Sequence, residues 1–205
     1  MSLEIFTFEQ GKPEWFAARA GIPTASEFDT VMAKGRSGGG RGETSKKYMR
    51  TLLGELLTGT VQESYSNAHM QRGTAMEPQA REMYAMLNDD ADIKQVGFMR
   101  NGRKGASPDS LVGNNGLLEI KTKMPHLQIE VLLAGTFPVE HKAQVQGQLW
   151  IAEREWCDFM SYWPGLPPFI TRVFRDDQYI RGLAVEIDLF NMEMDDMRAK
   201  IESMS

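Results

Sequence analysis

The segment SPDSLVGNNGLLEIK at residues 107–121 is the most informative part of this sequence. Its Gly-Asn-Asn-Gly centre is a turn signal between two apolar runs, and this pattern predicts a β-hairpin. Side chains alternate between the two faces of a strand, so Glu119 and Lys121 are expected on one face and Ile120 on the other. The turn can then bring Asp109 back beside Glu119 and Lys121.

These three polar residues point to a metal site. Leu117, Leu118 and Ile120 make the second strand look buried, where a glutamate and a lysine are costly unless they are paired or metal-bound. Two carboxylates and an ammonium at one sheet edge suit a hard cation such as Mg²⁺, which can activate water and stabilise a pentavalent phosphate. Aspartate and lysine are also common in turns and at strand edges, so the spacing alone leaves both interpretations open.

Length and composition indicate a single globular domain. The chain has 205 residues, of which 41% are hydrophobic and 25% charged, as is ordinary for a soluble protein with an adequate core. The only cysteine is Cys157, which excludes a disulfide framework within the chain. It also excludes a cysteine-ligated iron–sulfur cluster or structural zinc site within one chain. The N-terminus lacks the features of a secretion signal and no run approaches a membrane span, so we expect a cytoplasmic protein.

The charge is unevenly distributed. A net charge of −5 argues mildly against a nucleic-acid binder. However, residues 33–50 hold six basic residues against Glu43, whereas residues 176–205 hold eight acidic residues against three basic ones. One end could therefore meet phosphates while the other stays away from them. The simpler interpretation, which charge alone favours, is that both segments are solvated surfaces.

Periodicity and turn signals predict a mixed α/β chain. Thr24-Ala25-Ser26-Glu27 matches a capping box that opens a helix. Pro78 either kinks its helix or marks a second start after Glu77. The order of elements suggests an α/β sandwich with a mixed central sheet flanked by helices. We expect helices at about 24–34, 45–57, 68–87, 139–153 and 177–204, and strands at 93–99, 156–163 and 169–174, besides the hairpin.

Other polar residues are weaker candidates for a site. Glu77 is a surface or capping residue unless a metal site lies beside it. Gln144 and Gln148 lie one helical turn apart and could reach a phosphate or a catalytic water, or simply form a polar face. Arg19 and Ser26 flank a predicted helix N-terminus, where free backbone N–H groups attract anions. Taken alone, Glu77 and the pair Arg19 and Ser26 are better interpreted as ordinary surface or capping residues.

Taken together, the segments resemble the phage lambda-type 5′→3′ exonuclease family, also called phage alkaline exonucleases or viral recombinase nucleases. The similarity runs in order from about Gln10 to Tyr179, and an ordered set of this length is far more specific than one motif. The matching pieces are Gln10-Gly11, Trp15, Arg19, residues 21–26, Ala33-Lys34, residues 36–38, Gly73 to Glu77, Ala80-Arg81, residues 107–109, residues 118–121, residues 143–146 and Trp150.

The resemblance implies a restriction-endonuclease-like core of the Asp…Glu-x-Lys superfamily. It implies one nuclease domain, with a helical DNA-end-binding part at about 1–90, a metal-binding sheet core at 91–175 and a C-terminal helix at 177–204. The implied activity is processive, Mg²⁺-dependent digestion of the 5′ strand of linear double-stranded DNA, with Mn²⁺ as a possible substitute. The products are 5′-mononucleotides and a 3′ overhang.

The resemblance also implies partners and residue roles. The enzyme would be a homotrimeric ring that works beside a single-strand annealing protein in the cytoplasm of a bacterial host, encoded by a phage or prophage. Asp109 would bridge two metal ions, Glu119 and the Ile120 carbonyl would hold one of them, and Lys121 would orient the water. The remaining roles fall to Glu77 in the metal shell, Arg19, Ser26 and Ser107 at the 5′ phosphate, Gln144 at the reacting end, Arg36 on DNA and Met70 as a strand-separating wedge.

Two departures from the family pattern are visible. Thr122-Lys123-Met124 precede Pro125, where the family often has a small residue and then proline, so the strand is expected to end differently. Arg72 replaces an aromatic residue before Gly73, which bears on how the duplex end is gripped. The competing functions are an endonuclease with the same core and a non-catalytic DNA-binding protein that retains the fold.

Overall fold

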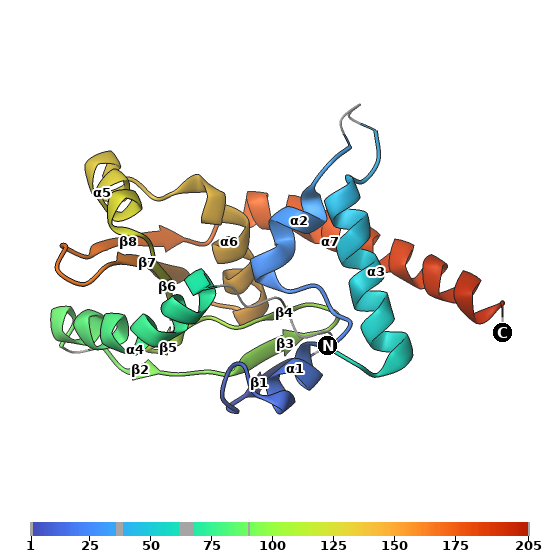
Figure 1. The fold of residues 1–205 in the computed structure, drawn as a ribbon, viewed down its shortest axis with the longest axis horizontal. Helices are drawn as coiled ribbons and strands as arrows, with labels where there is room; N and C mark the ends of the chain where they lie inside the picture. The colour runs from blue at the N-terminus through green and yellow to red at the C-terminus, as the bar shows by residue number, and fades with distance from the viewer. Residues whose placement is uncertain (1, 36–38, 62–67, 90, 205) are drawn as a thin grey trace.

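Two sheets form the framework of the described part of the protein (Figure 1). The computed structural model describes residues 2–35, 39–61, 68–89 and 91–204, with the backbone alone at 68–71. In the larger sheet β6 and β7 run parallel and the other neighbours antiparallel, which confirms the expected mixed sheet. Its order is β2 (Ile93–Lys94), β5 (Ser110–Val112), β6 (Gly116–Thr122), β7 (Trp156–Tyr162) and β8 (Phe169–Phe174).

The smaller sheet corrects the strand predicted at 93–99. Its order is β1 (Leu3–Phe6), β3 (Phe98–Asn101) and β4 (Gly105–Ala106). The predicted strand is divided, because β2 pairs with β5 in the larger sheet whereas β3 pairs with β1 in the smaller one. Gly97 lies at the crossing: its N–H donates to the Phe6 carbonyl at 2.9 Å, and a Cβ there would overlap the Phe8 carbonyl oxygen.

Most of the predicted helices are present. The helix α3 ends at Gly59, which adopts the left-handed conformation, and α4 continues through Pro78. The Asp176 carboxylate accepts from the Tyr179 N–H at 2.9 Å and caps α7. No described helix is long and apolar enough to cross a membrane. The helices are α1 (Pro13–Arg19), α2 (Phe28–Met32), α3 (Glu43–Thr58), α4 (Ala68–Leu87), α5 (Pro125–Ala134), α6 (Lys142–Ala152) and α7 (Asp177–Glu202), with 3₁₀ turns at Ala25–Glu27 and Val139–His141.

The helix predicted at 24–34 is wrong in its start and length. The chain forms a 3₁₀ turn at Ala25–Glu27 and then the short α2, which ends at Met32. Thr24 makes no side-chain cap, because its hydroxyl instead accepts from Arg19 Nη2 at 3.3 Å and contacts Ser26 Oγ at 3.3 Å. The Thr24 hydroxyl of the predicted capping box therefore bonds to neighbouring side chains and does not cap a helix.

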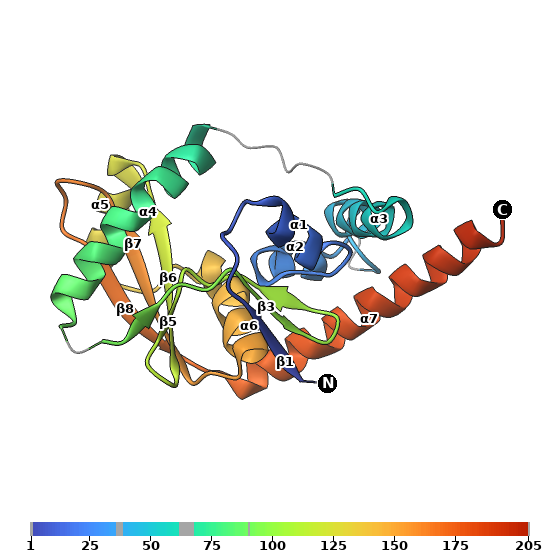
Figure 2. The ribbon, with the colours of Figure 1, turned by 90° about the horizontal axis from the view of Figure 1, so that it is seen from below.

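Side chains on β6 alternate between two cores. Leu117 packs with Phe159 in the core beneath α6, whereas Leu118 and Ile120 pack with Tyr84 of α4. Figure 2 shows α4 and α6 on opposite sides of the larger sheet. Burying a large apolar side chain stabilises a fold by about 1.5–3 kcal/mol, so both helices are firmly attached to β6. Residues projecting from β6 can consequently meet groups from either helix.

The basic segment and the acidic C-terminal helix lie in contact. Lys34 Nζ is 2.6 Å from a Glu186 oxygen, and Arg41 Nε is 2.7 Å from a Glu193 oxygen. Arg41 is almost fully buried and also donates to the Val31 carbonyl at 3.0 Å. The acidic helix α7 therefore neutralises part of the basic segment.

Cys157 is fully buried in β7 beside Phe159. Burial raises the pKa of its thiol well above the ordinary value, and the nearby Glu119 and Asp158 carboxylates raise it further. The thiol therefore stays protonated inside the larger core.

Gly97→Ala should destabilise the protein, because the new methyl group displaces the Phe8 carbonyl and separates β1 from β3. We expect a loss of about 2 kcal/mol or more in the free energy of unfolding, measured by urea denaturation. Gly54→Ala is the matched control. A Cβ at Gly54 meets nothing within 4 Å inside α3, so alanine there should stabilise by about 0.5–1 kcal/mol. Equal effects of the two substitutions would contradict the close contact at Gly97.

Candidate active site

Glu119 is the most deeply buried carboxylate of the predicted site, with 3% of its surface exposed. One oxygen accepts from Gln144 Nε2 at 2.6 Å and the other from Gln148 Nε2 at 2.6 Å. Lys121 Nζ lies 2.7 Å from the Glu119 oxygen that Gln144 also contacts. Hydrogen bonds to an ionised group are about twice as strong as neutral ones, so these partners offset the cost of burying the charge.

Asp109 lies beside β6, as the hairpin predicts. Its N–H donates to the Leu118 carbonyl at 3.1 Å, and its carboxylate accepts from the Ile120 N–H at 2.5 Å. Desolvation raises the pKa of the Asp109 carboxyl well above its usual range, and the charges of Glu119 and Glu77 raise it further. The Asp109 carboxylate therefore lies close enough to Glu119 and to Glu77 to be repelled by both, and added positive charge would relieve this repulsion.

Lys121 supplies one such positive charge. Burial would lower the pKa of its ammonium group, but the Glu119 and Asp109 carboxylates outweigh burial and the pKa is raised. Lys121 is therefore a stable cation on the same face of β6 as Glu119. His141 lies nearby and behaves differently, because burial and the charges of Lys121 and Lys123 lower its pKa to about 4. Its imidazole is neutral at physiological pH.

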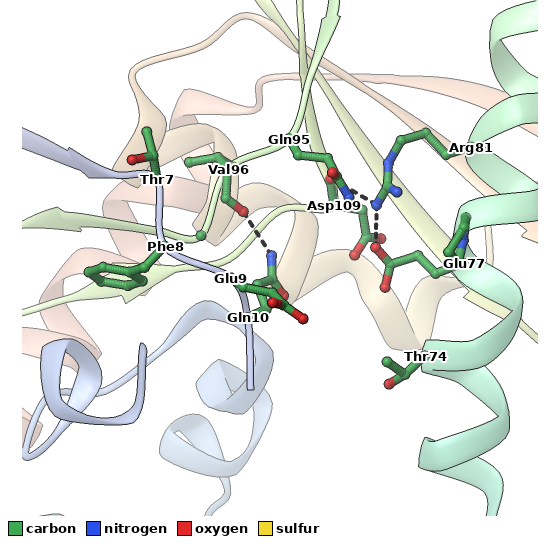
Figure 3. A pocket seen from close by; sticks show the side chains of 12 residues that line it. Thr7, Phe8, Glu9, Gln10, Thr74, Glu77, Arg81, Gln95, Val96 and Asp109 are labelled. Atoms are coloured by element: carbon green, nitrogen blue, oxygen red, sulfur yellow. Dashed lines mark hydrogen bonds and ion pairs between the residues drawn. The ribbon is translucent and has the colours of Figure 1, made fainter. Parts of the chain in front are cut away.

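Glu77 reaches the site from α4, on the other side of the sheet. Its carboxylate forms an ion pair with Arg81, one helical turn further along α4. Figure 3 shows the Glu77 and Asp109 carboxylates turned toward each other, with Arg81 beside both. Glu77 borders two cavities, one of about 330 Å³ that also includes Asp109 and one of about 350 Å³ that includes Lys121. Solvent or a ligand can thus approach Glu77 from two sides.

The chemistry of these side chains fits a hard cation. Asp109, Glu119 and Glu77 offer carboxylate oxygens from three separate elements, which is the ligand type that Mg²⁺ and Mn²⁺ prefer. In the described part of the chain, however, no three His, Cys, Asp or Glu residues already stand together as a metal-binding group. Their oxygens are bonded to Gln144, Gln148, Lys121, Arg81 and the Ile120 N–H. Binding a cation would require some of these bonds to exchange.

A second polar cluster surrounds Arg19. The Arg19 guanidinium stacks on the Trp15 ring at 4.1 Å and donates to Thr24 Oγ1 at 3.3 Å. Trp15 Nε1 donates to Ser107 Oγ at 2.8 Å, and the exposed Ser26 hydroxyl lies 3.3 Å from Thr24 Oγ1. Burial lowers the pKa of Arg19, which marks it as a largely desolvated cation. Trp15 and Thr24 thus connect Arg19, Ser26 and Ser107, for which the family resemblance implies a shared phosphate site.

Three further residues were candidates for contacts with the substrate: Gln144, Arg36 and Met70. The Gln144 side chain donates a hydrogen bond to Glu119 and does not extend into solvent toward a substrate. Arg36 lies outside the described residues, as does the side chain of Met70, whose backbone is in α4. Gln148 lies on the same helix face as Gln144, as the spacing of four residues predicts, but it contacts Glu119. No role for Arg81 was predicted from the sequence, although its spacing of four residues from Glu77 is a usable signal.

The family match and the similar solved structures show that the protein is a phage-type exonuclease, which is a deoxyribonuclease. Residues 14–155 match the family described as "YqaJ-like viral recombinase domain", and the chain belongs to this family. The match confirms the resemblance to lambda-type exonucleases. No curated protein sequence matches the chain.

Solved structures support the same relationship. The alkaline exonuclease LHK-Exo from Laribacter hongkongensis is 36% identical, with a TM-score of 0.84 over 94% of this chain and 97% of that one. The same enzyme in complex with dAMP is 37% identical, with a TM-score of 0.84 over the same shares. A phage-related exonuclease from Haemophilus somnus is 16% identical, with a TM-score of 0.66 over 90% of this chain and 96% of that one, and shows the shared fold.

Gln148→Leu should destabilise the protein, because it leaves one oxygen of the buried Glu119 carboxylate without its donor. We expect a loss of about 1.5–3 kcal/mol, measured by urea denaturation. In a Glu119→Gln background the charge is absent, so the same substitution should cost much less. An equal cost in both backgrounds would show that Gln148 acts through packing alone.

Proposed function

We propose that this protein is a Mg²⁺-dependent, processive 5′→3′ exonuclease on linear double-stranded DNA, which releases 5′-mononucleotides and leaves a 3′ overhang. The observation that carries the proposal is the convergence of Asp109, Glu119 and Glu77 beside the Lys121 ammonium. The family membership and the similarity to an alkaline exonuclease support it.

Each residue of the site has a role in the hydrolysis of a phosphodiester. Asp109, Glu119, Glu77 and the Ile120 carbonyl would hold two Mg²⁺ ions, or Mn²⁺ in their place. Such ions activate water and stabilise the charge that develops on the phosphate. Lys121 would orient the attacking water and offset negative charge, while Gln144 and Gln148 hold the Glu119 carboxylate in position.

The Arg19 cluster would bind the 5′-terminal phosphate. Arg19 is a desolvated guanidinium, and the exposed Ser26 adds a hydroxyl group. The Ser107 hydroxyl accepts from Trp15 Nε1 at 2.8 Å and donates to the Gly97 carbonyl at 2.9 Å, so it would exchange the latter bond to donate to a phosphate. Ser107 precedes Asp109 by two residues, so their Cα atoms are at most about 7 Å apart. This short separation would bring the proposed phosphate-binding hydroxyl close to the proposed catalytic carboxylate, which suits release of one nucleotide per cycle.

The proposal extends to the assembly. A homotrimeric ring with DNA at its centre requires basic charge on the inner surface only, so a net charge of −5 is compatible with DNA binding. A single-strand annealing protein would take over the 3′ overhang in the cytoplasm of a bacterial host. Arg36 on DNA, Met70 as a wedge and the division into a DNA-end-binding part, a sheet core and a C-terminal helix complete the proposal.

With Mg²⁺ present, the protein should digest a linear duplex with 5′ phosphates and leave a supercoiled circle intact. Gel electrophoresis separates these substrates, and chromatography identifies the released mononucleotides. Cleavage of the closed circle would instead favour an endonuclease with the same core.

Asp109→Ala and Lys121→Ala should each abolish digestion, because each removes a group that acts on the reacting phosphate. Circular dichroism should show that both variants remain folded. Lys123→Ala is the matched control for Lys121, since its ammonium instead lies 3.2 Å from the Glu140 carboxylate. Full activity of either site variant would refute the assignment.

Arg19→Ala should remove the preference for a 5′ phosphate over a 5′ hydroxyl and lower processivity. Digestion rates on duplexes that differ only in the terminal group measure this preference directly. An unchanged ratio of the two rates would exclude Arg19 from recognition of the DNA end.

A further inference from the structure

Arg81 occupies an unusual position for a residue that pairs with a candidate metal ligand. Its side chain is 15% exposed and lies between α4 and the start of β5. Besides the ion pair with Glu77, its Nε donates to Ser110 Oγ at 3.0 Å and its Nη2 to the Asp109 carbonyl at 3.3 Å. With its amide oxygen turned toward Arg81, Gln95 accepts from Nη1 at 2.7 Å.

These contacts hold the guanidinium in place without Glu77. Ser110, Asp109 and Gln95 all lie outside α4 and offer neutral oxygens, so they fix the position of Arg81 and leave its charge uncompensated. Ser110 Oγ itself donates to the Asp109 carbonyl at 2.6 Å, which ties these acceptors together. Glu77 is the partner that supplies the opposite charge, and Figure 3 shows its carboxylate close to the guanidinium of Arg81.

We infer that Arg81 is an internal counter-cation that neutralises Glu77 in the metal-free protein and gives up this carboxylate when a divalent cation binds. The inference rests on the proposed metal-dependent function. A guanidinium keeps its charge at any physiological pH, so it competes with a cation for Glu77 and also repels that cation. The positive charge of Arg81 therefore lowers the affinity of the site for metal while it stabilises the metal-free fold.

The test compares cation affinity in the absence of DNA. Isothermal titration calorimetry with MgCl₂ on the full chain should show that Arg81→Met binds Mg²⁺ about tenfold more tightly than the unaltered protein, because one nearby positive charge is gone. Without Mg²⁺, the same variant should have a lower Tm, and saturating MgCl₂ should raise its Tm by more than that of the unaltered protein. Adding Glu77→Gln to Arg81→Met should remove the gain in affinity.

Two further variants separate charge from folding. Arg81→Gln removes the charge but keeps hydrogen-bonding groups, so it should also bind Mg²⁺ more tightly even if Arg81→Met folds poorly. Arg172→Met is the matched control, because Arg172 forms a bidentate pair with the buried Asp158, away from the three carboxylates. It should lower the Tm and leave Mg²⁺ affinity unchanged.

The outcomes are distinguishable. Unchanged or weaker Mg²⁺ binding by Arg81→Gln would overturn the inference, since Arg81 would then position Glu77 rather than compete for it. A gain of the same size in Arg172→Met would also overturn it. Absence of Mg²⁺ binding by the unaltered protein would instead refute the proposed metal-dependent function, and the inference with it.

Discussion

The burial of the Glu119 charge is the constraint on which the rest of the site depends. An ionised carboxylate in a sheet core is tolerated only with strong partners, and here the partners come from α6 and from β6 itself. Two glutamines one turn apart on α6 fix the rotation of that helix relative to the sheet. The same carboxylate raises the pKa of Lys121 and of Asp109, so it couples the charges of the whole site.

The contacts that fix the position of α4 lie away from the carboxylates of the site. Tyr84 donates its hydroxyl proton to the buried Asp158 at 2.6 Å, and Asp158 also pairs with Arg172. This network anchors the C-terminal end of α4 to β7, two helical turns beyond Glu77. Glu77 therefore projects from a helix that is held by packing and hydrogen bonds elsewhere, and its carboxylate can change partners while its backbone stays in place.

Local patterns account for what could be predicted from the sequence. The hairpin, the shared face of Glu119 and Lys121, and the common face of Gln144 and Gln148 all follow from periodicity within one element. The division of the strand at Gly97 could not be predicted, because it depends on contact with a distant segment. The four acceptors of Arg81 likewise come together only in the fold, and α5 lacked a signal because apolar residues occur on all its sides.

The single thiol of the chain lies in β7 with its pKa raised and no surface exposed. Because the thiolate is the reactive form, Cys157 is inert toward alkylating reagents while the protein is folded. A cysteine introduced at an exposed position would thus be the one reactive site of the chain. The native sequence is in this respect already suited to the attachment of a single fluorophore or crosslinker, with which the path of a DNA strand across the protein could be followed.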